Sequence, residues 1–174
     1  MDEAAGIKLS SRIIHSGKVF TAVTDYIQLP TGRKVDLDII RHKQSVILLP
    51  MPDSDHIILV RQYRYAINQW IWELPAGNVE DDEHPDNAAR RECAEETGQA
   101  PSCIERLGAY FPTPGYCDEE MLFYRLTELR PAPEAELDAD EVLKPHTFAL
   151  DHARHLVSER QIVDMKTALG LALV

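Results

Sequence analysis

The sequence predicts an α+β protein built on a mixed sheet. Short β-prone runs fill residues 8–64, helix formers dominate residues 86–97, and residues 161–173 place apolar side chains at helical spacing. Strands early in the chain, with helices near its middle and end, are typical of this class. The 174 residues, of which 44% are hydrophobic, suffice for a sizeable core.

Residues 1–44 are expected to form an N-terminal antiparallel β region, and residues 45–174 the main domain. The β-prone runs of the first part lie at 11–14, 19–23, 26–29 and 35–39. The last two alternate apolar and polar side chains around Pro30, Thr31 and Gly32, which predicts a hairpin. These hairpins have no helices to cover them.

The main domain is expected to hold five strands and three helices. The strands are expected at 46–49, 57–64, 70–74, 104–111 and 120–126, and the helices at 86–97, 151–157 and 161–173. Pro85 suits the first turn of the middle helix, and Gly98 suits its C-terminal cap. Residues 131–141 are rich in Pro, Ala and acids and are expected to be a loop.

Composition excludes several classes of protein. The formal net charge of -11 argues against a nucleic-acid backbone as the main partner. Three irregularly spaced cysteines make neither a disulfide framework nor a zinc site. The N-terminus has no signal-peptide pattern, and the longest aliphatic run, 46–49, is too short to span a bilayer. We therefore expect a cytoplasmic protein that binds neither nucleic acid nor membrane.

Three carboxylates on the middle helix are candidates for a metal site. Glu92, Glu95 and Glu96 are three and four residues apart, so they lie near one helix face, where like charges repel. A divalent cation would relieve this repulsion, and Mg²⁺ prefers carboxylate oxygen. Taken alone, three glutamates are more often a solvated face.

The wider spacing favours a catalytic role. Gly77 is followed after five residues by Glu83, and after seven more by Arg91, Glu92, Glu95, Glu96 and Gly98 in one contiguous segment. This pattern resembles the Nudix box, and all seven fixed residues are present. At average residue usage, a chance match is on the order of one in a million. Cys93 takes an apolar position of the box, whereas Gln99 stands where an apolar residue is usual.

The resemblance implies a Nudix-type α/β/α sandwich and a metal-activated attack of water on a pyrophosphate. Glu83 and Arg91 would pair and brace the loop, Gly77 would permit the turn, and Glu95 would bind metal or orient the water. The metal ligands would be the Ala76 carbonyl, Glu92, Glu95 and Glu96. Two or three Mg²⁺ ions are expected, with Mn²⁺ as a possible substitute.

Segments outside the box resemble the ADP-ribose pyrophosphatase branch, over roughly residues 18–170. They are residues 61–64, 72–77, 112–115 and 164–167. The resemblance implies hydrolysis of ADP-ribose to AMP and ribose 5-phosphate. Alternatives are a hydrolase of another nucleoside diphosphate sugar, such as GDP-mannose, and a Nudix module that senses ADP-ribose without cleaving it. A triphosphate-cleaving enzyme is disfavoured by the outer segments.

The same resemblance supplies substrate residues and a homodimer. Phe20 and Arg41 fall where a ring and a guanidinium sandwich adenine, and the N-terminal strands would help to build the partner's pocket. Arg61 and Arg64, three apart on one strand, should point to different sides, and Arg61 is favoured for substrate. Further candidates are Pro114 and Gly115 for substrate, Asp138, Asp140 and Glu141 for the base (Asp140 and Glu141 preferred), and Glu119 and Glu120, beside Gly115, for the site.

Overall fold

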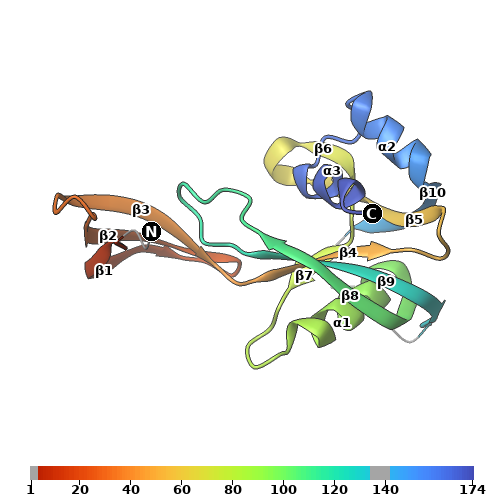
Figure 1. The fold of residues 1–174 in the computed structure, drawn as a ribbon, viewed down its shortest axis with the longest axis horizontal. Helices are drawn as coiled ribbons and strands as arrows, with labels where there is room; N and C mark the ends of the chain where they lie inside the picture. The colour runs from red at the N-terminus through yellow and green to blue at the C-terminus, as the bar shows by residue number, and fades with distance from the viewer. Residues whose placement is uncertain (1–3, 134–141) are drawn as a thin grey trace. The chain divides into compact units, whose positions relative to one another are not determined.

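The structure, a computed structural model, describes residues 4–133 and 142–174 (Figure 1). The strands are β1 (Ile7–Ser16), β2 (Phe20–Gln28), β3 (Lys34–His42), β4 (Ser45–Pro50), β5 (His56–Arg64), β6 (Gln69–Glu73), β7 (Ala76–Asn78), β8 (Gln99–Tyr110), β9 (Met121–Pro131) and β10 (Leu143–Ala149). The helices are α1 (Pro85–Thr97), α2 (Leu150–Ser158) and α3 (Met165–Ala172), with a 3₁₀ turn η1 (Tyr65–Ile67). Among the described residues, no helix is long and apolar enough to cross a membrane.

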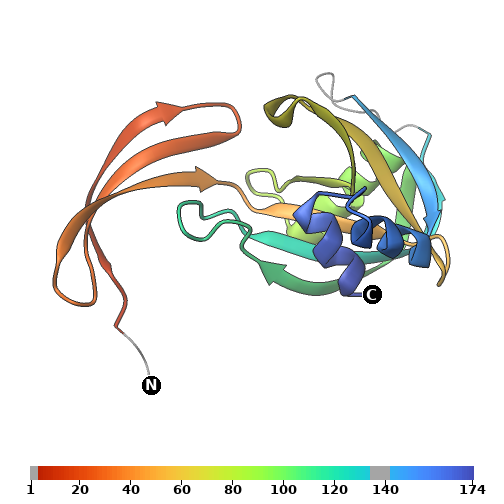
Figure 2. The same cartoon turned by 90° about the horizontal axis from the view of Figure 1, so that it is seen from above.

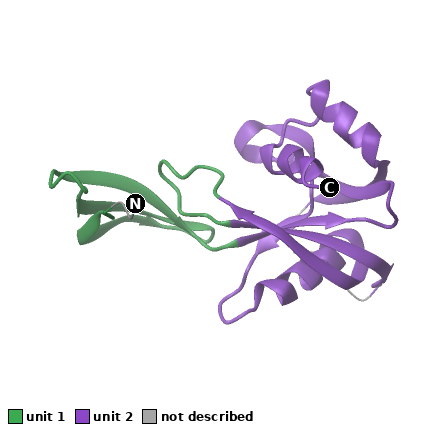
Figure 3. Ribbon diagram, in the orientation of Figure 1, with its two compact units in different colours: residues 1–44, 111–120 green, residues 45–110, 121–174 purple. Residues whose placement is uncertain are grey.

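The chain divides into two compact units (Figure 3). The first comprises Met1–Gln44 and Phe111–Glu120, and the second comprises Ser45–Tyr110 and Met121–Val174. The segment Phe111–Glu120 therefore packs with strands that precede it by some seventy positions, although the expected main domain included it.

The first unit is an antiparallel sheet of order β1-β2-β3, whose strands run as long curved ribbons (Figure 2). The predicted hairpin is confirmed: β2 and β3 flank a turn in which Gly32 has φ +84° and donates its N–H to the Leu29 carbonyl. Residues 111–120 join this sheet at Ile40, which exchanges backbone hydrogen bonds with Tyr116 and Asp118. That exchange anchors the loop to β3.

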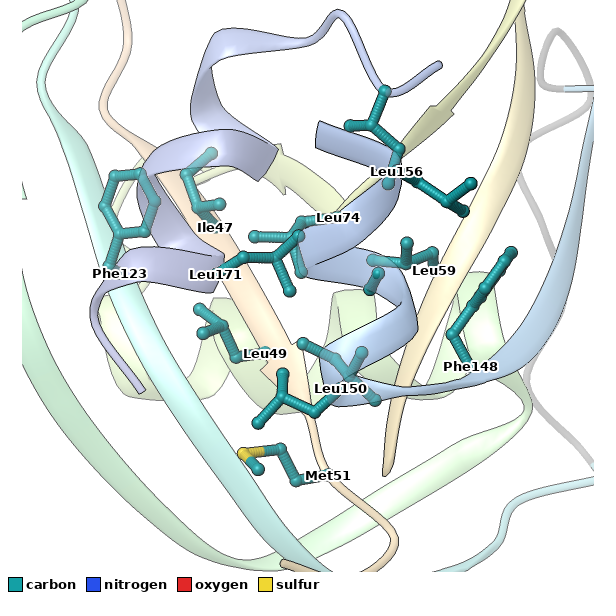
Figure 4. Close-up of a cluster of buried hydrophobic side chains, with 13 residues drawn as sticks. Ile47, Leu49, Met51, Leu59, Leu74, Phe123, Phe148, Leu150, Leu156 and Leu171 are labelled. Carbon is teal, nitrogen blue, oxygen red and sulfur yellow. The ribbon is translucent and has the colours of Figure 1, made fainter. Parts of the chain in front are cut away.

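The second unit is an α/β/α sandwich, which confirms the predicted fold class. Its mixed sheet has the order β7-β4-β9-β8, with β4 parallel to β9, and an antiparallel sheet β10-β5-β6 accompanies it. All of β4 is buried because its side chains alternate between two cores: Val46 and Leu48 pack with α1, while Ile47 and Leu49 pack with α2 and α3 (Figure 4). β4 is thus the central strand that carries both layers.

Helix α1 forms as its sequence predicts. Pro85 occupies its first turn, the His84 side chain accepts a hydrogen bond from the Asp86 N–H, and Gly98 ends the helix with φ +67°. The small side chains of Ala88, Ala89 and Cys93, all fully buried, let the helix approach the sheet closely. Cys93 therefore serves as a small hydrophobic residue in the apolar position.

Several predicted boundaries were wrong. The last helix begins at Met165 rather than at residue 161, because Asp164 caps it through the Thr167 N–H. Strands β8 and β9 extend beyond the predicted apolar runs, since their antiparallel pairing continues from Gln99 to Tyr110. Strands β7 and β10 were not predicted: they have no alternating pattern, and they form by pairing with β4 and β5.

Candidate functional site

The acidic face of α1 meets the edge strand β7. Gly77 lies so close to Glu92 that a Cβ on Gly77 would be 1.9 Å from the Glu92 carboxyl carbon. Only glycine allows this approach, which brings the backbone of β7 against the carboxylate. The box therefore combines two elements: a strand that supplies backbone and a helix that supplies acids.

Arg91 organises the carboxylates of this segment. Its guanidinium donates to both oxygens of Glu83, at 3.0 and 2.9 Å, so the expected pair forms with bidentate geometry. The same side chain donates to Glu92 at 2.7 Å, to Glu95 at 3.0 Å and to the Asn78 carbonyl at 3.1 Å. The hydrogen bonds from Arg91 lower the pKa of Glu83, and Glu83 in turn raises the pKa of Arg91. Both groups therefore stay charged at neutral pH.

The three box glutamates differ in exposure. Glu96 is buried, with 2% of its surface exposed, while the side chains of Glu92 and Glu95 are 13% and 31% exposed. Among the described residues, no three His, Cys, Asp or Glu side chains converge as a ready-made metal site. Here Glu92 and Glu95 are directed onto Arg91 instead.

Strand β7 also offers a main-chain carbonyl oxygen as a metal ligand. The Leu48 N–H donates to the Pro75 carbonyl at 2.9 Å, and Ile47 lies opposite Ala76 in the antiparallel pairing of β4 with β7. Because hydrogen-bonded and non-hydrogen-bonded pairs alternate in such a ladder, the Ala76 carbonyl points away from β4. With Glu92 and Glu96, the Ala76 carbonyl would make an all-oxygen ligand set, and such a set fits a hard divalent cation such as Mg²⁺.

Arg61 and Arg64 lie on opposite faces of β5, as their spacing predicted. The Arg61 guanidinium lies 5.3 Å from the centre of the Trp72 ring, a cation–π contact. Arg64 makes two hydrogen bonds of 2.7 Å to the Glu73 carboxylate, and these hydrogen bonds raise the pKa of Arg64. Arg64 is therefore tied to Glu73, whereas Arg61 lies against Trp72 on the other face of β5. The preference for Arg61 as a substrate residue stays a prediction.

Glu73 is a functional candidate that the sequence alone did not single out. It is 1% exposed and accepts hydrogen bonds from Arg64 and from the buried ammonium of Lys166. Burial raises the pKa of Glu73, but the hydrogen bonds from Arg64 and the charge of Lys166 outweigh it and hold the pKa below its usual value. Glu73 and Lys166 lie in two of the segments that resemble the ADP-ribose pyrophosphatase branch. Their pairing, across 93 residues, has no signal in the sequence.

Phe20 and Arg41 lie on opposite faces of the first unit's sheet. Phe20 pairs with His42, while Arg41 pairs with Thr21, and neighbouring residues of a strand alternate between faces. Arg41 binds Asp25 and, at 2.8 Å, Asp118. Phe20 is 42% exposed. The two side chains therefore cannot sandwich one base within a single sheet.

The remaining candidates fall outside the box. Pro114 and Gly115 lie exposed in the segment Phe111–Glu120 of the first unit, near Glu119 and Glu120. Gln44 donates a hydrogen bond to Glu120. Asp138, Asp140 and Glu141 lie outside the described residues. The roles of all these residues stay predictions.

Several known proteins are similar to this chain. Residues 41–165 match the NUDIX domain family. The ADP-ribose pyrophosphatases of Bacillus subtilis (strain 168) and Mycobacterium tuberculosis (strain ATCC 25618 / H37Rv) are 35% and 33% identical, over 91% and 95% of this chain and 86% and 81% of theirs. The methanol dehydrogenase activator of Bacillus methanolicus is 33% identical over 91% of this chain and 86% of its own.

A solved structure shares the fold. A crystal structure of an ADP compounds hydrolase superposes with a TM-score of 0.83 at 21% identity, covering 99% of this chain and 94% of that one. The family match spans most of the chain and includes the segment where Gly77 and Glu92 meet. The protein is a member of the NUDIX domain family.

Proposed function

We propose that the protein is a Mg²⁺-dependent pyrophosphohydrolase that converts ADP-ribose to AMP and ribose 5-phosphate. The observation that carries this proposal is the meeting of β7 with the acidic face of α1, at Gly77 and Glu92. The two ADP-ribose pyrophosphatases at 33–35% identity support the substrate.

The residues of the box have different proposed roles. The Ala76 carbonyl, Glu92 and Glu96 would hold Mg²⁺, with Glu95 as a further ligand or as the group that orients water. Bound Mg²⁺ would neutralise the phosphate oxygens and make water a better nucleophile. The pair of Glu83 and Arg91 keeps the loop over the helix in place.

The reaction itself needs one water and one base. The water oxygen bonds to one phosphorus, the bridging P–O bond breaks, and the proton passes to a carboxylate. Attack at either phosphorus gives the same two products. We propose Asp140 or Glu141 as that base, with Asp138 as the third candidate. Glu119 and Glu120 are further candidates for the site.

We also propose a cytoplasmic homodimer with a shared substrate pocket. Strand β1 is exposed along its whole length and presents Ile7, Leu9, Ile13 and Ile14. Because Phe20 and Arg41 face opposite ways in one sheet, an adenine clamp would take one of them from each protomer. The free thiols of Cys93, Cys103 and Cys117 suit a reducing compartment. A monomeric mass by light scattering would contradict the dimer.

A substrate panel tests the function. Initial rates with Mg²⁺ would be measured for ADP-ribose, GDP-mannose, dinucleotides and nucleoside triphosphates, with release of AMP and ribose 5-phosphate followed by chromatography. ADP-ribose should give the highest kcat/KM. Preference for GDP-mannose would favour the alternative nucleotide-sugar hydrolase, and tight ADP-ribose binding without turnover would favour a sensing module.

A further inference from the structure

The N-terminal turn of α3 contacts the chain just before the box at two points. The Lys166 ammonium binds the Glu73 carboxylate at the end of β6. The Thr167 Oγ1 accepts a hydrogen bond of 2.7 Å from the N–H of Leu74, the next residue. Lys166 and Thr167 are 8% and 0% exposed, so both contacts are shielded from water.

Asp164 fixes the geometry of this turn. Its Oδ2 accepts from the Thr167 N–H at 2.9 Å, from the Thr167 hydroxyl at 2.5 Å and from Lys166 at 3.0 Å. Because a hydroxyl has one proton, and Thr167 gives it to Asp164, the Thr167 oxygen is left to accept the Leu74 N–H. The turn is therefore preset as an acceptor for one backbone donor.

These contacts act on the expected metal ligand through a very short link. Only Pro75 separates Leu74 from Ala76, and the ring of Pro75 fixes its φ. The Pro75 carbonyl is bound by Leu48 on β4. Leu74 is held by α3 and Pro75 by β4, so the direction of the Ala76 carbonyl depends on both anchors.

Glu73 connects the same turn to β5. On its other side it binds Arg64 through two hydrogen bonds. Lys166 and Arg64 thus share one buried carboxylate. Loss of Lys166 would leave Glu73 with Arg64 alone and remove one of the two contacts between α3 and the end of β6.

We propose that Thr167 and Lys166 are positioning residues for the metal site: they hold the segment of Leu74 and Pro75 so that the Ala76 carbonyl is aimed at the ion. This inference rests on the proposed function. Neither residue is placed on substrate or metal, so neither is a catalytic residue. Partners that orient a ligand typically change metal affinity by 10–100-fold when they are removed.

The test uses metal affinity as well as activity. Mn²⁺ binding to the metal-free full chain would be measured by EPR for the wild type, Thr167→Val and Lys166→Met. Thr167→Val keeps the side-chain shape and removes the acceptor, and Lys166→Met keeps the length and removes the charge. We expect the Mn²⁺ dissociation constant and the Mg²⁺ midpoint for activation to rise about tenfold in each. The KM for ADP-ribose at saturating Mg²⁺ should stay within about twofold.

Two further variants separate positioning from general loosening of α3. Arg154→Met removes contacts of α2 to the Leu171 carbonyl at the C-terminal end of α3 and to the Val174 carbonyl beyond it. It should lower the melting temperature and leave Mn²⁺ affinity unchanged. Thr167→Ser keeps the hydroxyl and should therefore keep the wild-type affinity for Mn²⁺. If Thr167→Val does not fold, Lys166→Met and Thr167→Ser decide the question.

The outcomes distinguish this inference from the proposed function. A wild type that binds neither Mn²⁺ nor ADP-ribose overturns the proposed function, and the inference with it. An active wild type with unchanged Mn²⁺ affinity in Lys166→Met and Thr167→Val overturns the inference alone. An equal loss of affinity in Arg154→Met also overturns it, because the effect would then be one of stability.

Discussion

Glu92 occupies the space that any side chain at position 77 would need. A Cβ on Gly77 would lie 1.9 Å from the Glu92 carboxyl carbon and 2.1 Å from its Oε1. The backbone at Gly77 does not lie in the left-handed region, so the requirement for glycine here is one of space rather than of backbone conformation. Backbone and carboxylate are thereby held together at the expected metal site.

Gly77→Ala should therefore displace Glu92 and weaken metal binding. We expect a Mn²⁺ dissociation constant at least about tenfold higher, measured by EPR on the metal-free protein. Gly6→Ala is a matched control, because its Cβ would have a single contact at 3.4 Å and lies far from the box in sequence. Equal affinities for wild type and Gly77→Ala would show that the close approach has no role in the site.

Glu96→Gln should abolish most of the activity and leave the fold intact. The substitution keeps the shape of this buried side chain but removes the charge that a cation needs. We expect kcat to fall about a hundredfold or more, with an unchanged far-UV circular dichroism spectrum. Glu105→Gln, in an exposed ion pair with Arg125, is the control. Near wild-type rates in Glu96→Gln would remove it from the ligand set.

Glu73 should make stability depend on pH in the acid range. Its folded pKa is held below the ordinary value of 4.5, so its contribution is fully present above about pH 4.5 and is lost as the pH falls through the folded pKa. Urea unfolding between pH 3 and pH 7 should show a flatter acid limb for Glu73→Gln than for the wild type. At pH 7 the variant should be less stable by about 3 kcal/mol, because Lys166 and Arg64 lose their shared anion. Parallel acid limbs would contradict the assignment.

Phe20 and Arg41 should give different phenotypes. Phe20 is exposed, so Phe20→Ala should raise the KM for ADP-ribose with little loss of stability. Arg41→Ala leaves Asp25, which is 3% exposed, without its guanidinium, and should lower the stability of the protein. Steady-state kinetics and urea unfolding of both variants would check this. An unchanged KM in Phe20→Ala would remove Phe20 from the pocket.

The sequence predicted the features whose causes are local. Pro85 and Gly98 mark the ends of α1 because they act on their own turns. The hairpin around Gly32 follows in the same way from alternation on either side of a turn. The ends of α1 and the hairpin could be predicted without knowledge of the rest of the chain. The Glu83–Arg91 pair, in contrast, was expected only from the resemblance to the Nudix box.

The features that the sequence could not predict depend on distant partners. Strand β7 is only three residues long and exists because β4 lies beside it. Glu73 and Lys166 are 93 residues apart, and the local sequence around each residue does not indicate its partner. The apolar spacing from residue 161 suggested a longer helix, whereas the Asp164 side chain caps the helix at Met165.

The assignment of residues 111–120 to the first unit has a consequence for modularity. The chain passes between its two units three times, after residues 44, 110 and 120. A truncation at residue 44 would not yield a clean catalytic fragment, because Ile40 and Arg41 supply the hydrogen bonds that hold this internal loop. The N-terminal strands are therefore not a detachable appendage, and exchange of this region between relatives would have to exchange the internal loop with it.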